Sequence, residues 1–362
     1  MPARSEPTTS QDLIQEDLER ILRPNLPRLK LLANRHLVIT GGSGALGLWL
    51  LEMLAFLNRT QKWDIQATVL SRRAPEIPRR LPQLNDIRFN FLATDVRHLA
   101  ELPADTDHII HAAALTDRRQ IASIPVQVIG TNTLGTDRVL QAATRTEALR
   151  SFVHLSSGLV LGQAGLGENL AEDHSGRMPA PFGGDVYVES KRCAEALLAA
   201  QANESKLPIV VLRPFTILGP YQPLDLPWAM TDFVREGLAG GPIRLFSDGS
   251  PVRSLMYLAD FAYWVLIATL HAAPRSVYHV GSDEAVDMLT LARLVAAEIQ
   301  PSPAIVTGLG RVPTQAQRLV PDIRRAAREL QLKPTVSLTE AVHRTVLWYR
   351  LQRPLTSANP LS

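Results

Sequence analysis

The segment Tyr187-Val188-Glu189-Ser190-Lys191 places a phenol four residues before an ammonium group. Four residues are about one turn of a helix, so the two side chains would lie on the same helical face. A free tyrosine has a pKa of about 10, and a nearby cation favours its phenolate. The pair could therefore exchange a proton with a hydroxyl or carbonyl oxygen.

A glycine-rich turn, residues 41–47, directly follows the apolar run 36–40. Its glycines have the spacing G-x-x-G-x-x-G, which allows a tight strand-to-helix turn and lets a pyrophosphate approach the start of the helix. Such a turn is weak evidence alone, but its position between an expected strand and an expected helix favours a dinucleotide site. The expected cofactor contacts of the turn are Gly41, Ser43, Gly44, Ala45, Leu46 and Gly47.

Three further segments are expected to contact the cofactor. Ser71 and Arg72 stand where an NAD-selective site normally has an acidic residue, and they could bind a 2′-phosphate instead. The sequence therefore favours NADP(H) and leaves NAD(H) possible; the alternative is that Arg72 belongs to a solvated loop. Asp95 and Val96 are expected beside the adenine, and the small residues after His111, namely Ala112 and Ala113, give the dinucleotide room.

Strands and helices alternate from residue 36 onward. The expected strands are 36–40, 65–70, 87–92, 108–111, 152–155 and 209–212, and the expected helices are 46–58, 134–143 and 188–201. This alternation predicts an α/β fold with a doubly wound parallel (Rossmann) sheet and ligands at the carboxyl ends of its strands. Proline and glycine then break the pattern, which predicts a smaller C-terminal substrate-binding lobe.

The chain is accordingly divided into four parts: an N-terminal helical extension at 1–34, a dinucleotide-binding domain at 35–218 with a return strand at 276–281, a lobe at 219–352 that mostly binds substrate, and a tail at 353–362. The extension repeats apolar residues at helical spacing and is expected to pack on the main domain or on a second subunit. The glycine- and proline-rich stretch 162–184 is expected to form a loop over the substrate.

Composition excludes several classes of function. With 38 basic and 35 acidic residues the net charge is +3, too balanced for a nucleic-acid-binding protein. No apolar signal core is evident, and the apolar stretch 255–270 contains Asp260 and is expected to be a buried helix, so we expect a cytoplasmic protein without membrane contact. The single cysteine, Cys193, is expected to be a packing residue, and His111, His154 and His174 lack metal-ligand spacing.

Together these residues resemble the extended short-chain dehydrogenase/reductases, in particular the NAD(P)-dependent epimerase/dehydratase family, whose members act on nucleotide sugars. The resemblance runs from His36 to about Tyr349. The motifs that carry it are the turn 41–47, Asp95-Val96, 111–114, Ser156-Ser157, Tyr187 with Lys191, Arg213-Pro214 and 248–254. It implies a homodimer formed through helices that follow Gly135 and Asp185.

The resemblance also assigns roles to individual residues. Ser157, with Ser156 as its nearest competitor, would bond the oxygen that Tyr187 serves, so the implied catalytic set is Ser157, Tyr187 and Lys191. Further cofactor contacts are implied at Tyr187, Lys191 and Pro214, and substrate contacts at Thr116, Ser157, Thr216 and Arg253. Arg253 would pair with the diphosphate, whereas Thr216 stands where the family often has asparagine.

The residues after Ser157 indicate the type of reaction. Sugar 4,6-dehydratases of this family usually have Asp-Glu there, and the decarboxylases usually keep the glutamate, but this chain has Gly158 and Leu159. The leading interpretation is thus a reversible hydride transfer at C4 of a nucleoside-diphosphate sugar, by an epimerase or a ketoreductase. The alternatives are a dehydratase or decarboxylase with an acid and base from elsewhere, such as Glu168, Glu172 or Asp173, a reductase of a non-sugar carbonyl, and a non-catalytic dinucleotide sensor.

Overall fold

The computed structural model describes residues 7–84, 88–162, 168–174, 185–310 and 318–352. Its main sheet has seven strands in the order β11-β6-β5-β4-β1-β2-β3, all parallel to their neighbours. The strands are β1 (His36–Thr40), β2 (Gln66–Ser71), β3 (Phe89–Ala93), β4 (His108–His111), β5 (Ser151–Leu155), β6 (Ile209–Pro214) and β11 (Ser276–Val280). The predicted doubly wound parallel sheet is confirmed. The start of the strand expected at 87–92 lies outside the described residues.

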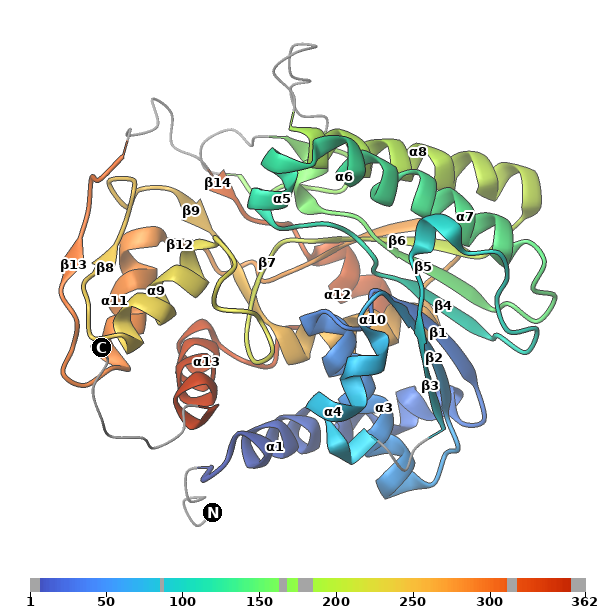
Figure 1. The fold of residues 1–362 in the computed structure, drawn as a ribbon, viewed down its shortest axis with the longest axis horizontal. Coiled ribbons are helices and arrows are strands. Elements are labelled where there is room, and N and C mark those ends of the chain that lie inside the picture. Colours follow the sequence, from blue (N-terminus) through green and yellow to red (C-terminus); the bar gives the residue numbers. More distant parts are fainter. Residues whose placement is uncertain (1–6, 85–87, 163–167, 175–184, 311–317, 353–362) are drawn as a thin grey trace.

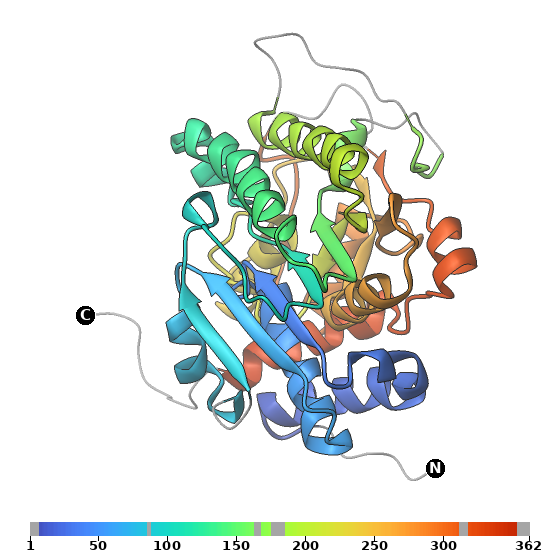
Figure 2. The same cartoon turned by 90° about the vertical axis from the view of Figure 1, so that its right-hand side faces the viewer.

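Helices cover both faces of this sheet (Figure 1, Figure 2). On one face lie α6 (Pro125–Asn132), α7 (Leu134–Ala143) and α8 (Val186–Ser205), and on the other lie α3 (Ala45–Gln61) and α10 (Leu258–His271). Apart from the edge strand β3, which is buried at Phe89 but mostly exposed beyond it, the strands are largely buried on both faces, which is why they read as apolar runs.

Helix α10 corrects one expectation from the sequence. Residues 255–257 are not helical but form β10 (Leu255–Tyr257), which pairs with β7 (Thr216–Leu218). The helix after them is buried on almost every side. Asp260 is tolerated there because its carboxylate accepts hydrogen bonds from the backbone N–H groups of Thr335, at 2.7 Å, and Val336, at 3.0 Å.

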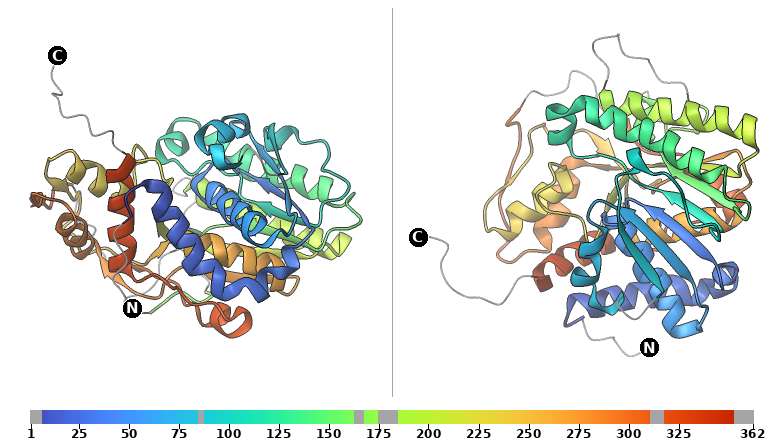
Figure 3. Two further views of the ribbon diagram at one scale, coloured as in Figure 1. Left: turned by 90° about the horizontal axis from the view of Figure 1, so that it is seen from below. Right: turned by 45° about the vertical axis from the view of Figure 1, so that its right-hand side comes forward.

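The N-terminal helix α1 (Ser10–Leu22) packs on its own chain. Thr9 caps it, and its apolar residues are buried against α3, α10 and α13 (Leu338–Gln352). Figure 3 shows α1, in dark blue, beside the red α13. The buried carboxylate of Asp17 accepts a hydrogen bond from the Tyr257 hydroxyl at 2.6 Å and pairs with Arg344 at 2.9 Å. Through these contacts α1 joins the sheet side of the molecule to the smaller lobe.

The smaller lobe is built from short elements. Its helices are α9 (Ala229–Leu238), α11 (Met288–Ala297) and α13, and its strands are β8 (Ile243–Arg244), β9 (Val252–Arg253), β12 (Val286–Asp287), β13 (Ile305–Val306) and β14 (Arg318–Leu319). Strand β9 lies between β12 and β14 and carries Arg253. The short helices α2 (Leu26–Leu29), α4 (Ile77–Arg80), α5 (Arg118–Ser123) and α12 (Arg324–Leu330) connect the larger elements. In the part of the chain that is described, no helix combines the length and apolar character needed to cross a membrane.

Candidate active site

The glycine turn after β1 has the shape of a dinucleotide cradle. Gly41 has φ +72°, and a Cβ atom there would lie 2.7 Å from the backbone nitrogen of Ala113. A Cβ at Gly47 would lie 2.3 Å from the Cα of Gly42, so α3 can approach the turn closely only with glycine at this position. Gly44, the exposed N-cap of α3, has no side chain to cover the helix N-terminus. The first N–H groups of α3 therefore remain available to an anion.

His111 supports the neighbouring loop from inside the protein. Its Nδ1 lies 2.7 Å from Thr40 Oγ1 and its Nε2 lies 3.0 Å from Thr136 Oγ1. Burial lowers the pKa of His111 to about 3, so the ring is neutral. Thr40 Oγ1 in turn accepts a hydrogen bond from the backbone N–H of Ala113 at 3.1 Å. These bonds hold the half-buried Ala112 and Ala113 against the glycine turn.

The expected cofactor-selecting residues lie at the ends of β2 and β3. The hydroxyls of Ser43 and Ser71 are 2.6 Å apart, and Arg72 is exposed beside them. Asp95 accepts hydrogen bonds from Arg97 Nε, at 3.0 Å, and Nη2, at 2.7 Å, and this pairing lowers the pKa of Asp95 to about 2.

Val96, expected beside the adenine, is buried. A Cβ at Gly135 of α7 would lie 2.8 Å from Val96 Cγ2, so the valine side chain packs against that helix.

Tyr187, Lys191 and Ser157 converge where α8 passes the end of β5. Asp185 caps α8 by accepting from the backbone N–H of Tyr187 at 2.9 Å, which places this tyrosine in the first turn. The Lys191 ammonium is buried and donates to the backbone carbonyl of Leu155 at 2.6 Å. The Ser157 hydroxyl hydrogen-bonds the Tyr187 phenol. The three residues expected to be catalytic are therefore neighbours.

Burial controls the proton affinities in this cluster. It raises the pKa of Tyr187 to about 12, against the lowering effect of the Ser157 hydrogen bond. It lowers the pKa of Lys191 to about 8, against the raising effect of the Glu195 charge. The lowering of the Tyr187 pKa by Lys191, expected from their spacing, stays a prediction: burial has the largest effect on this phenol, and the Lys191 ammonium is directed at the carbonyl of Leu155.

The two candidate serines have different partners. Ser156 donates to Glu195 Oε1 at 2.5 Å and is thereby directed away from the phenol. Ser157 accepts from the backbone N–H of Leu159 at 3.2 Å and bonds Tyr187. Of the two, Ser157 is the serine next to the phenol.

Neither residue after Ser157 can transfer a proton. A Cβ at Gly158 would lie 2.7 Å from Cε2 of the Phe215 ring, so the position has no room for a side chain. Leu159 presents an apolar side chain that is 38% exposed. Among the acids named as substitutes, Glu172 accepts from the backbone N–H of His279 at 3.2 Å, and Glu168 and Asp173 are exposed. The carboxylate of Glu172 thus has its hydrogen-bond partner on the edge strand β11.

Two arginines, Arg253 and Arg118, lie close enough for their charges to interact. Arg253 of β9 is half-buried and donates to the carbonyl of Val252 at 2.8 Å. Desolvation lowers the pKa of Arg253, and so does the positive charge of Arg118 at the start of α5. Arg118 was not among the residues expected at the site, although its place shortly after β4 indicates the carboxyl edge of the sheet. Of the other expected contacts, Thr216 and Pro214 are half-buried at the ends of β7 and β6, and Thr116 is exposed.

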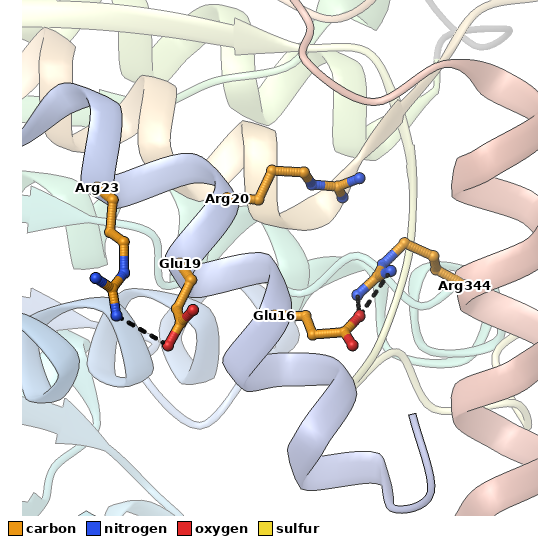
Figure 4. Close-up of a pocket in the computed structure, with 5 residues that line it drawn as sticks. All are labelled: Glu16, Glu19, Arg20, Arg23 and Arg344. Carbon is orange, nitrogen blue, oxygen red and sulfur yellow. Dashed lines mark hydrogen bonds and ion pairs between the residues drawn. The ribbon is translucent and has the colours of Figure 1, made fainter. Parts of the chain in front are cut away.

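Two features lie apart from this set of residues. A surface hollow between α1 and α13 is lined by charged side chains that all have ion-pair partners: Glu16, Glu19, Arg20, Arg23 and Arg344 (Figure 4). Cys193 is exposed on α8, so its expected packing role is wrong; it follows Lys191 by two positions, which turns it to a different side of the helix. Within the described ranges no cluster of histidine, cysteine and acidic side chains could hold a metal ion.

The chain is similar in sequence to known proteins. A sequence model described as "NAD dependent epimerase/dehydratase family" matches residues 37–281. A UDP-glucuronic acid decarboxylase 1 of Xenopus tropicalis is 24% identical over 339 residues, covering 92% of this chain and 77% of its own. A dTDP-glucose 4,6-dehydratase of an Actinoplanes species is 28% identical over 326 residues, covering 88% and 98%.

Solved structures share the fold. A UDP-N-acetylglucosamine 4-epimerase of Methanobrevibacter ruminantium M1 superposes with a TM-score of 0.76 at 20% identity, covering 88% of this chain and 99% of its own. A UDP-glucose 4-epimerase of Thermotoga maritima superposes with a TM-score of 0.72 at 20% identity, covering 87% and 98%.

Proposed function

This chain belongs to the NAD dependent epimerase/dehydratase family, and from that premise we propose that it interconverts a hydroxyl and a ketone at C4 of a nucleoside-diphosphate sugar by reversible hydride transfer. The observation that carries the proposal is the meeting of Ser157, Tyr187 and Lys191 at the end of β5. Parallel strands present their carboxyl ends at one edge of the sheet, so this cluster and the glycine turn after β1 share that edge.

The cradle fits a nicotinamide dinucleotide. A pyrophosphate would lie on the uncovered start of α3, where Gly44 leaves space, and the small Ala112 and Ala113 would border the cofactor. Lys191 would bind the nicotinamide ribose, with Pro214 close by. The bound nicotinamide supplies the acceptor or donor of the hydride.

Side chains of the protein transfer the proton and orient the sugar. Tyr187 removes the proton from the C4 hydroxyl in the oxidising direction and returns it in the reducing direction. Ser157 hydrogen-bonds the same oxygen and so orients C4 towards the phenol. Arg253 pairs with the diphosphate, for which a guanidinium provides two parallel donors, and Thr216 and Thr116 are further substrate contacts.

We propose chemistry at C4 without loss of water or carbon dioxide, although the curated relatives named above are a decarboxylase and a dehydratase. Elimination needs a further acid and base, and Gly158 and Leu159 provide neither. The ring of Phe215 supports this proposal, because it occupies the space of an acidic side chain at position 158.

Two finer proposals concern the cofactor and the assembly. NADP(H) is favoured over NAD(H), because Ser71 and Arg72 can bind a 2′-phosphate and neither is acidic.

We propose a homodimer through α7 and α8. The exposed apolar side chains of Val126, Ile129 and Leu134 on α6 and α7 support it, because a second copy would cover them.

The proposal is tested by following the absorbance of the bound nicotinamide while nucleoside-diphosphate hexoses are added one at a time. A hexose that serves as substrate is expected to reduce the oxidised cofactor in the wild-type protein but not in Tyr187→Phe. A thermal-shift panel identifies the nucleotide, because a ligand that binds only the folded state stabilises it. Reduction that is equal in both proteins would overturn the acid/base role of Tyr187.

A further inference from the structure

Helix α8 directs three side chains at the end of β5. Tyr187, Lys191 and Glu195 follow one another at intervals of four residues and so form one stripe along the helix. Their partners are the last residue of β5 and the two residues that follow it: the carbonyl of Leu155 for the lysine, the hydroxyl of Ser156 for the glutamate, and Ser157 for the tyrosine. Tyr187 and Lys191, the two residues proposed to act in proton transfer, are thus followed on the same stripe by a third residue, Glu195, that contacts the same segment.

Glu195 is itself held firmly. Arg213 of β6 donates to Oε1 through Nε at 3.0 Å and to Oε2 through Nη2 at 2.7 Å. The two side chains are only 18% and 13% exposed, and Arg213 also donates to the backbone carbonyl of Glu172 at 2.7 Å. Two parallel hydrogen bonds between a guanidinium and a carboxylate fix the orientation of the carboxylate and favour its charged form.

The bond between Ser156 and Glu195 acts on both neighbouring residues. The carbonyl that receives the Lys191 ammonium belongs to the peptide bond preceding Ser156, and the hydroxyl beside Tyr187 belongs to the residue following it. If Ser156 turned, both groups would move. A displacement of about 1 Å at a reacting group can lower a rate by about 100-fold.

We propose that Glu195, clamped by Arg213, is a positioning residue that anchors Ser156 and thereby orients both Ser157 and Lys191 for proton transfer. This proposal rests on the acid/base role proposed above for Tyr187 and Lys191. It adds a residue that touches neither substrate nor cofactor and acts through the end of β5.

The charge of Glu195 has a second consequence. His111 of β4 and His154 of β5 also face Lys191, and burial lowers the pKa of both, so they are neutral and do not stabilise the ammonium. Burial raises the pKa of Tyr187 to about 12, so its phenol carries no charge that would stabilise the ammonium. Of the acids in the described part of the chain, Glu195 is the one whose charge raises the pKa of Lys191.

The experiment uses the lysine side chains as probes. The chain has five lysines, Lys30, Lys62, Lys191, Lys206 and Lys333. Lysine labelled with ¹³C at Cε gives one NMR signal for each, and Lys191→Met assigns the signal of interest. The full-length, cofactor-free protein is titrated as wild type, as Glu195→Gln, and as the matched control Glu189→Gln, which removes a carboxylate of the same helix that is 40% exposed and pairs with Arg192.

We expect the titration midpoint of Lys191 to fall by at least ~0.5 pH units in Glu195→Gln and to be unchanged in Glu189→Gln. We also expect Ser156→Ala, which leaves the pair of Glu195 and Arg213 intact, to lower kcat by about 10-fold or more with little change in KM. An unchanged midpoint in Glu195→Gln together with normal kcat in Ser156→Ala would overturn the proposal.

Failure of the proposed function gives a different result. Normal turnover in Tyr187→Phe would remove the acid/base role, while the lysine titration would still report whether Glu195 acts on Lys191. A loss of kcat in Ser156→Ala without any change of midpoint in Glu195→Gln would overturn the electrostatic part alone.

Discussion

The aromatic ring of Phe215 occupies the space that a side chain at position 158 would need. A Cβ atom on Gly158 would lie 2.7 Å from Cε2 of that ring, closer than non-bonded carbon atoms approach. Phe215 itself packs against His279 of β11, with ring centroids 5.1 Å apart, and this contact restricts displacement of the phenyl ring. The absence of an acid after Ser157 is therefore a property of the packing as well as of the sequence.

The first prediction follows from this contact. We expect Gly158→Ala to lower the free energy of unfolding by about 1–3 kcal/mol, because the added methyl group must displace the phenyl ring. Urea unfolding measures the change. Gly130→Ala is the control: no atom lies within 4 Å of its added Cβ, and alanine in α6 is expected to raise the free energy of unfolding by about 0.5–1 kcal/mol. Equal effects of the two changes would contradict the proposed crowding.

The second prediction concerns the phenol. We expect Tyr187→Phe to bind the nicotinamide cofactor as the wild type does, while turnover falls by about 10²–10⁴-fold, because the ring remains but the proton-transferring oxygen is lost. Cofactor titration and steady-state kinetics measure the two effects. Near-normal turnover would remove Tyr187 from the mechanism.

The third prediction concerns the choice of cofactor. Arg72 is exposed, as expected of a side chain that would meet a 2′-phosphate at the surface. We expect NADP(H) to bind more tightly than NAD(H), and Arg72→Ala to weaken NADP(H) alone by about 1.5–3 kcal/mol. Calorimetric titration of both cofactors measures this difference. Equal affinities that do not change in the variant would mean that Arg72 is a solvated surface charge.

The fourth prediction concerns the attachment of α1. Arg344 pairs with the fully buried Asp17, whose pKa burial raises to about 6. We expect Arg344→Met at neutral pH to lower the free energy of unfolding by about 1–3 kcal/mol, because the buried carboxylate loses one of its two cations and keeps only Arg20, at 2.7 Å. Arg23→Met, which breaks the exposed pair with Glu19 in Figure 4, is the control and should cost less than about 1 kcal/mol. Similar losses in both variants would argue against a special role for the buried pair.

The sequence predicted the sheet well, because each central strand is an apolar run between turns and is buried on both faces. Residues 255–257 were misassigned because a short buried strand followed by a buried helix has one continuous apolar pattern. Cys193 was misassigned because its position on α8 depends on which face of the helix meets the sheet.

Spacing also located the tyrosine and the lysine but could not give their proton affinities. Those depend on burial and on contacts between distant segments. The bond of Ser156 to Glu195 and the approach of Arg118 to Arg253 both join residues that the sequence separates widely.

Product analysis tests the central claim, reversible hydride transfer at C4 of a nucleotide sugar, most directly. Purified protein is incubated with nucleoside-diphosphate hexoses and with nucleoside-diphosphate 4-ketohexoses, and each product is examined by mass spectrometry and by NMR for the configuration at C4. We predict either an unchanged mass with inverted configuration, which identifies an epimerase, or a gain of two hydrogens by the ketone, which identifies a ketoreductase. A product lighter by one water or by carbon dioxide would contradict the account.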